Sequence, residues 1–411
     1  MTKNNNKSIL DQIMDNYQAE EVANLDAVEI ITNLFNELDE RGRDILIRRF
    51  ALREDRKETL EEIGKIHELT RERIRQIEAT SINRLKQLEN LDRHLSGLKN
   101  IIINLLEEHG GLMEKEYLFN NLVNFSISGG KNGENEMKHK RHFDFLISKL
   151  LHDEFEAIGD SEYFKESFKL KYQSLEHLEA LAKELQEKIQ EIKKIFMTEE
   201  LINLSKGFEV YKNNQEKFNP AGDLDISGIL INNLFKEKAD VINSNKVIYS
   251  ILQAAKKIEQ NKFGFWGIND WREIKPRTIN DKIYLILKNS GKPMHFSEIA
   301  DRINKISFDK KKANAATVHN ELILDEKYIL VGRGLYGFQE WGYQKGAVAD
   351  VIEKILAESE QSLSREEIIN KVLTQRIVKK ATITLALTDR NKFEITADGK
   401  YKIKVGANST E

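Results

Sequence analysis

The chain has 411 residues, of which 40% are hydrophobic and 32% are charged, and its formal net charge is −3. This length exceeds what one hydrophobic core usually supports, so we expect several small domains, and the composition excludes both wholesale disorder and a uniformly basic nucleic-acid binder. The absence of cysteine excludes disulfides, thiol catalysis and cysteine-bound zinc.

No apolar run approaches the length needed to cross a bilayer, so we expect no membrane contact and a cytoplasmic location. Only three prolines occur, which favours a mainly α, multidomain chain because proline interrupts helices. Residues 1–40 hold nine acidic side chains and two lysines, whereas residues 41–86 hold thirteen basic and nine acidic ones. We interpret residues 1–24 as an acidic and polar N-terminal segment, and we expect nucleic-acid contact in the basic stretch that follows.

The first strongly patterned segment, residues 59–88, predicts two helices joined by a short turn. Thr59 followed by Glu62 is typical of a capping box at a helix start, and Thr70 is typical of a second N-cap. Apolar and small side chains then recur at helical spacing on one stripe of the second helix. These residues are Ile74, Ile77, Ser81, Leu85 and Leu88.

The opposite side of the second helix carries side chains that can read base edges. They are Arg71, Glu72, Arg75, Gln76, Ala79 and Asn83. Arginine can bond guanine, glutamine can bond adenine and glutamate can accept from cytosine. A short first helix and a second helix with such a surface predict a helix-turn-helix, although a charged, solvated helix face gives the same pattern.

Three consecutive stretches carry a resemblance to a known family. "RGRDILIRRFAL" at 41–52, "TLEEIGKIHELTRERIRQIEAT" at 59–80 and "INRLKQL" at 82–88 resemble region four of the primary bacterial sigma factors, which recognises the promoter −35 element. The resemblance implies that Arg71, Glu72, Arg75 and Gln76 read bases in the major groove. It also implies backbone contacts from Arg41, Arg49, Thr59, Leu60, Arg73, Thr80 and Arg84.

Two departures from that family alter the expectation. His67 stands where the family usually has an apolar side chain, which predicts looser packing before the turn. The acidic and polar residues before the module leave no room for the region that melts the −10 element, so we expect something other than a complete sigma factor. We interpret residues 25–95 as the sigma region 4-like helix-turn-helix domain.

Residues 97–170 are interpreted as a winged-helix-like domain, because helical patterns are followed by the strand pattern "FEAIGDSEYF". Phe155, Gly159 and Tyr163 lie 173 positions before Tyr328, Gly332 and Tyr336, which suggests equivalent wings. The polar stretch at 126–142 predicts a mobile loop. Residues 171–275 are interpreted as a long amphipathic helix plus a degenerate winged helix, because "NKFGFWGINDW" resembles a wing.

The C-terminal third contains an internal repeat. Six positions recur 69 residues on, from Ile283, Ile286, Leu287, Glu298, Ile299 and Ile303 to Ile352, Ile355, Leu356, Glu367, Ile368 and Val372. Six more recur 65 residues on, from Ala316, Thr317, Leu322, Lys327, Gly334 and Tyr336 to Ala381, Thr382, Leu387, Lys392, Gly399 and Tyr401. Each copy predicts three helices closed by a β-hairpin, which is a winged helix.

The stretches "LKNSGKPMHFSEIADRI", "TVHNELI" and "YILVGRGLYGF" resemble the HARE-HTH winged-helix family, which includes a domain of the bacterial RNA polymerase delta subunit and also occurs fused to restriction enzymes. We interpret 277–345 as such a domain and 347–405 as its repeat. Lys310, Lys311, Lys312 and Arg333 are candidates for wing contacts with phosphates, or else are solvated loop charges. Trp266, Trp271 and Trp341 follow predicted wings and are interpreted as core anchors.

The sequence offers no pattern typical of catalysis. His139 and His142 form an isolated H-x-x-H without a third ligand nearby, and "EMK" at 136–138 lacks the preceding aspartate of a nuclease motif. No phosphate-binding glycine loop or nucleophile elbow occurs. We therefore expect no enzyme activity, no cofactor, no metal and no small-molecule substrate.

These observations favour a bacterial transcription factor that binds double-stranded promoter DNA and acts with RNA polymerase. Two alternatives fit the same patterns. The first is an adaptor that grips polymerase through the sigma-like domain without reading DNA. The second is the DNA-recognition subunit of a restriction or defence system.

Overall fold

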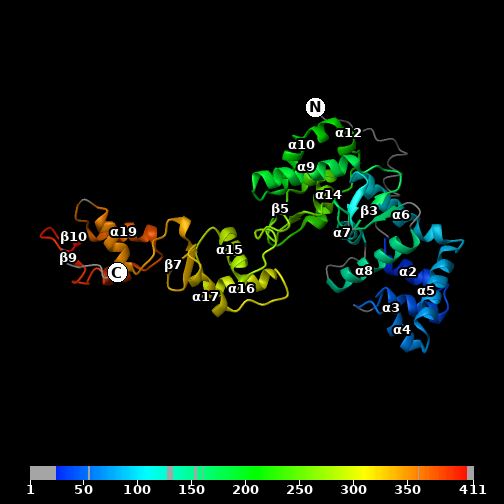
Figure 1. Cartoon of the computed structure of the whole chain (residues 1–411), viewed down its shortest axis with the longest axis horizontal. Coiled ribbons are helices and arrows are strands. Elements are labelled where there is room, and N and C mark those ends of the chain that lie inside the picture. Colours follow the sequence, from blue (N-terminus) through cyan, green and yellow to red (C-terminus); the bar gives the residue numbers. More distant parts are fainter. Residues whose placement is uncertain are drawn as a thin grey trace, which may run out of the picture. The chain divides into compact units, whose positions relative to one another are not determined.

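The computed structural model describes residues 25–53, 56–126, 133–151, 155–159, 161–359 and 361–404, so the N-terminal segment 1–24 lies outside the described residues. The chain is mainly helical and multidomain, with short strands (Figure 1). It divides into an N-terminal body up to Gln260 together with 264–269, and a C-terminal body of 261–263 together with the residues from Asp270 onward. No helix among the described residues has the length and apolar character needed to cross a membrane.

The N-terminal body begins with four helices, which we call the head. They are α2 Ala27–Phe35, α3 Glu40–Arg49, α4 Leu60–His67 and α5 Arg71–Lys86. Ile45, Ile63 and Ile74 come from three different helices and form a fully buried core cluster. α3 and α5 pack closely because Gly42 has no side chain: a Cβ there would lie 2.5 Å from the hydroxyl of Ser81.

The next elements form module A. They are α6 Leu91–Glu108, β1 Leu112–Glu114, α7 Lys115–Phe125, α8 Gly133–Phe145 continued by the π-helix η1 Leu146–Leu150, β2 Phe155–Ile158 and β3 Ser167–Leu170. The sheet order is β1-β3-β2. The predicted domain boundary between residues 95 and 97 falls inside the continuous helix α6, which joins the head to module A.

Two further expectations for module A are corrected. In the segment predicted as a mobile loop, residues 126–142, the part from Gly133 onward is helical and belongs to α8, whereas residues 127–132 lie outside the described residues. Tyr163 is not the counterpart of Tyr336: it precedes β3, and Phe168 takes that position, because both Phe168 and Tyr336 pair with a methionine on the first strand of their sheet. A longer connection between β2 and β3 accounts for the shifted spacing.

The remaining part of the N-terminal body is module B, which follows the same plan with an insertion. Its elements are α9 Glu176–Ile192, α10 Thr198–Lys206, α11 Glu209–Asn213, α12 Gln215–Phe218, η2 Ser227–Leu230, α13 Ala239–Asn243, α14 Lys246–Ala254, β4 Ile258–Gln260 and β5 Trp266–Ile268. β4 and β5 form the hairpin that the sequence suggested as a degenerate wing. Trp266 is buried and its indole N–H donates to the hydroxyl of Thr198 at 2.9 Å, whereas Trp271 and Trp341 are only half-buried.

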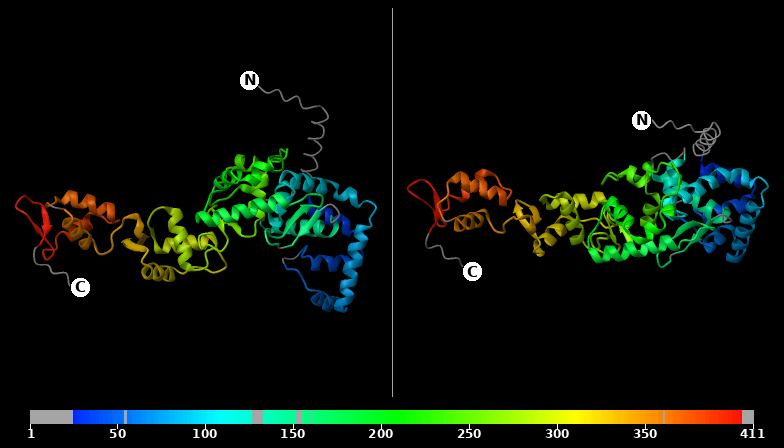
Figure 2. Two further views of the ribbon diagram at one scale, coloured as in Figure 1. Left: turned by 45° about the horizontal axis from the view of Figure 1, so that its top comes forward. Right: turned by 90° about the horizontal axis from the view of Figure 1, so that it is seen from above.

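The C-terminal body contains modules C and D, which can be followed in Figure 2 from the yellow helices to the red hairpin. Module C comprises α15 Ile279–Ser290, β6 Met294–His295, α16 Phe296–Ile306, α17 Ala315–Leu324, β7 Tyr328–Gly332, β8 Leu335–Phe338 and η3 Gln339–Trp341. Module D comprises α18 Val348–Ala357, α19 Arg365–Gln375, α20 Lys380–Ala386, β9 Phe393–Ile395 and β10 Tyr401–Ile403. The sheet of module C has the order β6-β8-β7, which matches that of module A.

One backbone pairing is common to all four modules. In each, an apolar residue just before the second helix pairs with an aromatic residue on the last strand. The pairs are Met113 with Phe168, Phe196 with Trp266, Met294 with Tyr336, and Leu363 with Tyr401. The four modules therefore share the order helix, extended residue, helix, helix and hairpin, and Tyr336 and Tyr401 occupy equivalent positions.

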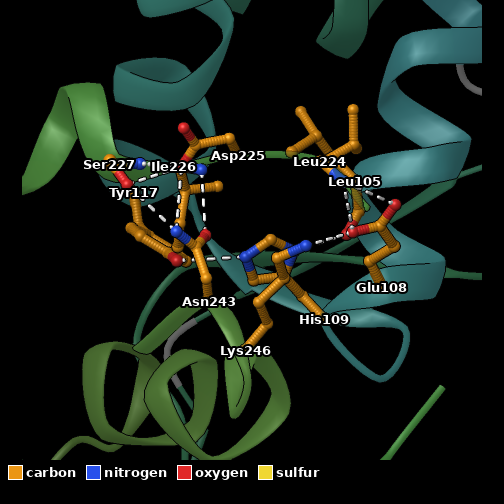
Figure 3. Close-up of polar contacts among 10 residues, drawn as sticks. All are labelled: Leu105, Glu108, His109, Tyr117, Leu224, Asp225, Ile226, Ser227, Asn243 and Lys246. Atoms are coloured by element: carbon orange, nitrogen blue, oxygen red, sulfur yellow. Dashed lines mark hydrogen bonds and ion pairs between the residues drawn. The ribbon is translucent and has the colours of Figure 1, made fainter. Parts of the chain in front are cut away.

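A buried polar cluster joins module A to module B (Figure 3). The carboxylate of Glu108, at the end of α6, forms an ion pair with the ammonium group of Lys246, at the start of α14. The same carboxylate accepts from the backbone N–H of Leu224 at 3.2 Å. The neighbouring His109 ring contacts the carbonyl of Leu105 and the hydroxyl of Tyr117, and burial lowers its pKa to about 3, so it adds no charge at neutral pH.

The insertion of module B is tied to the same cluster through Asn243. Its side-chain amide donates to the carboxylate of Asp225 at 2.8 Å and to the hydroxyl of Ser227 at 3.0 Å, and its carbonyl accepts from the backbone of Ile226 (Figure 3). These bonds fix the segment that supplies the Leu224 N–H to Glu108. The charge of Glu108 is thus balanced by one cation and by a backbone donor, as buried charges require.

The head packs against module A through an aromatic contact. Phe145, at the end of α8, is buried between Phe35 of α2 and Phe50. The centroid of its ring lies 5.6 Å from that of Phe35 and 4.9 Å from that of Phe50, and both contacts are edge-to-face. Such contacts add to the free energy of burial. Lys149 lies over the ring of Phe50, and Lys57 forms an ion pair with Asp144 at 3.6 Å. We therefore expect the head to depend on α8 for its stability.

Replacing Phe145 by alanine should destabilise the N-terminal body by ~3–5 kcal/mol, because a large buried ring is lost without compensation. Met137→Ala on the same helix is the matched control, since Met137 is 53% exposed. Amide hydrogen exchange of residues 28–36 should accelerate in the Phe145 variant and stay at the wild-type rate in the control. Equal exchange in both variants would show that α8 does not support the head.

Candidate nucleic-acid interface

The start of α4 is fixed by its capping box. The Thr59 hydroxyl accepts from the backbone N–H of Glu62, and the Glu62 carboxylate accepts from the backbone N–H of Thr59 at 2.7 Å. These bonds lower the pKa of Glu62 to about 2, together with a side-chain bond from Arg56. The capping box predicted from the sequence is confirmed, and its carboxylate stays charged at neutral pH.

The turn between α4 and α5 depends on a close approach of two backbones. Leu69 donates its backbone N–H to the carbonyl of Gly64, and a Cβ on Gly64 would lie 2.6 Å from the Leu69 carbonyl oxygen. Glu68 ends α4 in the left-handed conformation, with φ 55°. Thr70 then caps α5 by accepting from the N–H of Arg73, as the sequence predicted.

His67 does not loosen the packing before this turn, contrary to the expectation. Its Nε2 lies 2.9 Å from the carboxylate of Asp44 on α3, and that carboxylate also accepts from Arg48 at 2.7 Å. Arg48 in turn bonds Glu58. A polar link between α3 and α4 therefore replaces the apolar contact, and Asp44 is a positioning residue that the sequence pattern does not single out.

α5 presents two distinct faces. Ile74, Ser81 and Leu85 are buried against the head, which agrees with the predicted stripe. Arg71, Glu72, Arg75 and Gln76 are all exposed on the other side. The structure thus places the four predicted base-reading residues on one accessible surface, which we call the reading face.

The members of the reading face bond to one another and to their neighbour Arg73. Arg75 donates through Nε and Nη2 to both oxygens of the Glu72 carboxylate, at 2.9 and 2.7 Å. Arg73 donates to the side-chain oxygen of Gln76 at 3.1 Å. The bond from Arg75 lowers the pKa of Glu72 and raises that of Arg75, so both groups stay charged. Exposed ion pairs of this type are weak, so a base edge can compete for either group.

The predicted backbone contacts fall into two groups. Arg41, Thr59, Arg73, Thr80 and Arg84 are exposed. Arg49 and Leu60 are less exposed than these five. Arg49 donates to the carbonyl of Glu58 at 3.1 Å and pairs with Glu78 at 3.6 Å. The side chain of Leu60 packs on the core of the head, although its backbone N–H, in the first turn of α4, has no acceptor within the helix.

The other candidates lie outside the head. Lys310, Lys311, Lys312 and Arg333 are exposed in module C, with Arg333 in the turn between β7 and β8. His139 and His142 of the H-x-x-H pair are buried on α8, and His142 bonds the carbonyl of Lys138. The residues that the structure describes contain no cluster of three or more histidine or acidic side chains suited to a metal ion.

Comparison with known proteins identifies the head. Residues 34–87 match the family described as Sigma-70, region 4. The RNA polymerase sigma factor RpoS of Coxiella burnetii is 35% identical over 95 residues, which is 22% of this chain and 27% of that protein. The RNA polymerase sigma factors SigA of Microcystis aeruginosa and of Synechocystis are each 48% identical over 58 residues, which is 14% of this chain and 14% of each relative.

The chain therefore contains a sigma-70 region 4 domain within a larger protein. It spans about a quarter or less of the length of these curated relatives. No solved structure matches the chain. The matched residues include the whole of α3, α4 and α5, so the shared part carries the reading face and most of its supports.

Gly64→Ala should destabilise the head by ~1–3 kcal/mol, because the new methyl group collides with a backbone carbonyl that cannot move without opening the turn. Gly97→Ala is the control, since nothing lies within 4 Å of a Cβ at that position of α6. The control should be neutral or slightly stabilising, because alanine favours helix. Urea unfolding followed by circular dichroism measures both, and a neutral Gly64 variant would contradict the close backbone approach in this turn.

Proposed function

We propose that this chain is a sequence-specific DNA-binding transcription factor that acts with RNA polymerase. The observation that carries the proposal is the reading face: Arg71, Glu72, Arg75 and Gln76 are exposed on the second helix of a sigma-70 region 4 domain. The residue types suit base edges, and the preceding helix and turn hold α5 as a helix-turn-helix requires. The proposed site is a −35-like promoter element in double-stranded DNA.

The fork between Glu72 and Arg75 prepares the arginine for base recognition. Because Nε and Nη2 of Arg75 bond the carboxylate, the pair favours one orientation of the guanidinium plane before DNA arrives. A guanine approaching the remaining N–H groups would meet an oriented donor, and the Glu72 oxygens retain lone pairs for a cytosine amino group. Gln76 can exchange its bond from Arg73 for an adenine.

Contacts with DNA phosphates would fix the position of α5 in the major groove. Arg41, Arg73 and Arg84 supply exposed cations, and the hydroxyls of Thr59 and Thr80 lie in the same domain. The start of α4 adds the Leu60 N–H and the positive end of a helix dipole. Arg49 would contribute only after releasing its bonds to Glu58 and Glu78, so we assign it the weakest role.

The modules are proposed to be winged helices of the HARE-HTH type whose main contacts are with protein. The third helix of a winged helix often enters DNA, but here α8 of module A packs against α2, and α14 of module B packs on β1. In module C, α17 contains neither arginine nor lysine and exposes Ile323 and Leu324. We propose RNA polymerase as the protein partner, with additional phosphate contacts from Lys310, Lys311, Lys312 and Arg333.

One observation favours the adaptor alternative. Four polar side chains of α5 already satisfy one another in the free protein, as on an ordinary solvated helix. Affinity purification of the tagged full-length chain, with bound DNA and protein both identified, separates the alternatives. Polymerase with promoter DNA supports the proposal, polymerase without DNA supports the adaptor, and restriction or defence subunits support the third interpretation.

Gln76→Ala and Arg75→Ala should each weaken binding to the best selected DNA site by ~1–3 kcal/mol and change binding to random DNA little, because base contacts distinguish sequences. Lys65→Ala is the control, since Lys65 is exposed on α4 and pairs only with Glu61 among the described residues. Site selection from a random DNA pool followed by fluorescence anisotropy tests this. Unchanged site preference in both variants would rule out base reading by α5.

Salt dependence separates the contribution of the head from that of module C. The slope of log affinity against log salt should be shallow for a fragment of residues 25–269, which retains the N-terminal body, at about −3 to −6, because only a handful of phosphates can be neutralised. The full chain should show a steeper slope. Replacing Lys310, Lys311, Lys312 and Arg333 by glutamine should return the slope of the full chain to that of the fragment. Equal slopes for the unchanged full chain and the fragment would mean that modules C and D do not contact DNA.

A further inference from the structure

A small cavity lies where the head meets module A. It has a volume of about 150 Å³ and is lined by residues of α2, α3, the segment after α3, and α8. All of these elements belong to the N-terminal body. This volume is smaller than the ~300–1,000 Å³ of pockets that enclose drug-sized ligands, so the space suits a small ligand.

The lining of this cavity is basic on one side and apolar on the other. Arg43, Arg53 and Lys138 contribute three cations, and no acidic side chain lines the cavity among the described residues. Ile31 and Phe35 belong to the apolar side. Three like charges around one small space repel each other, and their repulsion is weakest when an anion lies between them.

One of the three cations is anchored, and the other two carry charges that the described residues do not neutralise. Arg43 donates through Nε to the carbonyl of Phe35 at 2.9 Å and through Nη2 to that of Leu38 at 3.4 Å, which holds its guanidinium beside the cavity. Arg53 and Lys138 form no ion pair with any residue that the structure describes. Both side chains line the cavity.

His142 adds a buried hydrogen-bonding group. It is 3% exposed, lines the cavity and uses Nδ1 to bond the carbonyl of Lys138 at 2.7 Å. Burial lowers its pKa to about 4, so at neutral pH the ring is uncharged. It does not supply a fourth charge, but its second nitrogen can bond a polar ligand atom.

From the cavity size, the three cations and the apolar wall, we infer that this is a binding site for a small oxyanion, namely phosphate or a short-chain carboxylate. The oxyanion accepts bonds from Arg53 and Lys138 and from the free nitrogen of Arg43. The ligand touches α2 and α3 on one side and α8 on the other. It therefore stabilises the contact between the head and α8 to which Phe145 also contributes. This inference does not rest on DNA binding.

Isothermal titration of the full-length chain with inorganic phosphate and, separately, with butyrate tests the site in a buffer free of other oxyanions. We expect one equivalent to bind, and the stronger of the two identifies the ligand class. Lys138→Gln and Arg53→Gln should each weaken binding about tenfold, because each removes one charge-assisted hydrogen bond. Lys65→Gln removes a charge from the head outside the cavity and should leave affinity unchanged.

Amide hydrogen exchange gives a second measurement of binding, which does not rely on the heat released in the titration. Ligand should slow exchange in residues 28–36 and 138–145, and this protection should be lost in the Lys138→Gln variant. Arg53 is exposed, so we expect the Arg53→Gln variant to fold normally. It can therefore test the site even if the Lys138→Gln variant is unstable. Absence of binding by both anions at millimolar concentration, or binding that none of the cavity variants weakens, would overturn the inference.

Discussion

The packing of Phe145 between Phe35 and Phe50 is the contact on which the arrangement of the N-terminal body depends. α8 is the third helix of module A, and in an isolated module its surface would be free. Here the ring of Phe145 instead packs against Phe35 and Phe50 of the head. The contact leaves the reading face of α5 exposed, because the buried side of α5 is the one that carries Ile74 and Leu85. The head and module A are therefore one folded unit rather than two independent domains joined by a linker.

The remaining modules repeat one backbone pairing, between an apolar residue before the second helix and an aromatic residue on the last strand. The side chains around this pairing differ from module to module. Trp266 occupies the position of Phe168, and its indole N–H requires the partner that Thr198 provides. Modules A and B are joined by the ion pair of Glu108 and Lys246, whose side chains are 10% and 7% exposed. A buried pair of this kind contributes little net stability, but removing one partner leaves an unpaired charge, so it selects one mode of packing over others.

Much of the head can be predicted from sequence because its signals are local. The capping box at Thr59, the N-cap at Thr70 and the apolar stripe of α5 all lie within a few residues of the structure they specify. The equivalence of Tyr336 and Tyr401 is visible because the spacing around them recurs within one chain. These features need no knowledge of distant contacts.

Sequence patterns mislead where distant residues decide the structure. The polar stretch before Phe145 forms a helix because α2 packs against it, a contact that lies about a hundred positions away in sequence. The link from His67 to Asp44 spans 23 residues, and that from Glu108 to Lys246 spans 138. The constant offset of 173 positions equates Tyr163 with Tyr336 wrongly, because the connection between β2 and β3 in module A is longer than that between β7 and β8 in module C. The basic cavity has no sequence signature because its lining comes from three separate segments.

The paired geometry of Glu72 and Arg75 has a consequence for how recognition by this protein can change. The two side chains bond each other, so in the DNA complex that we propose a substitution at position 72 would free the guanidinium of Arg75 and change the base that it prefers. The effects of substitutions at the two positions are then not additive. Under the proposed base reading, a new target sequence would require coordinated replacement of both residues, and single replacements would relax specificity.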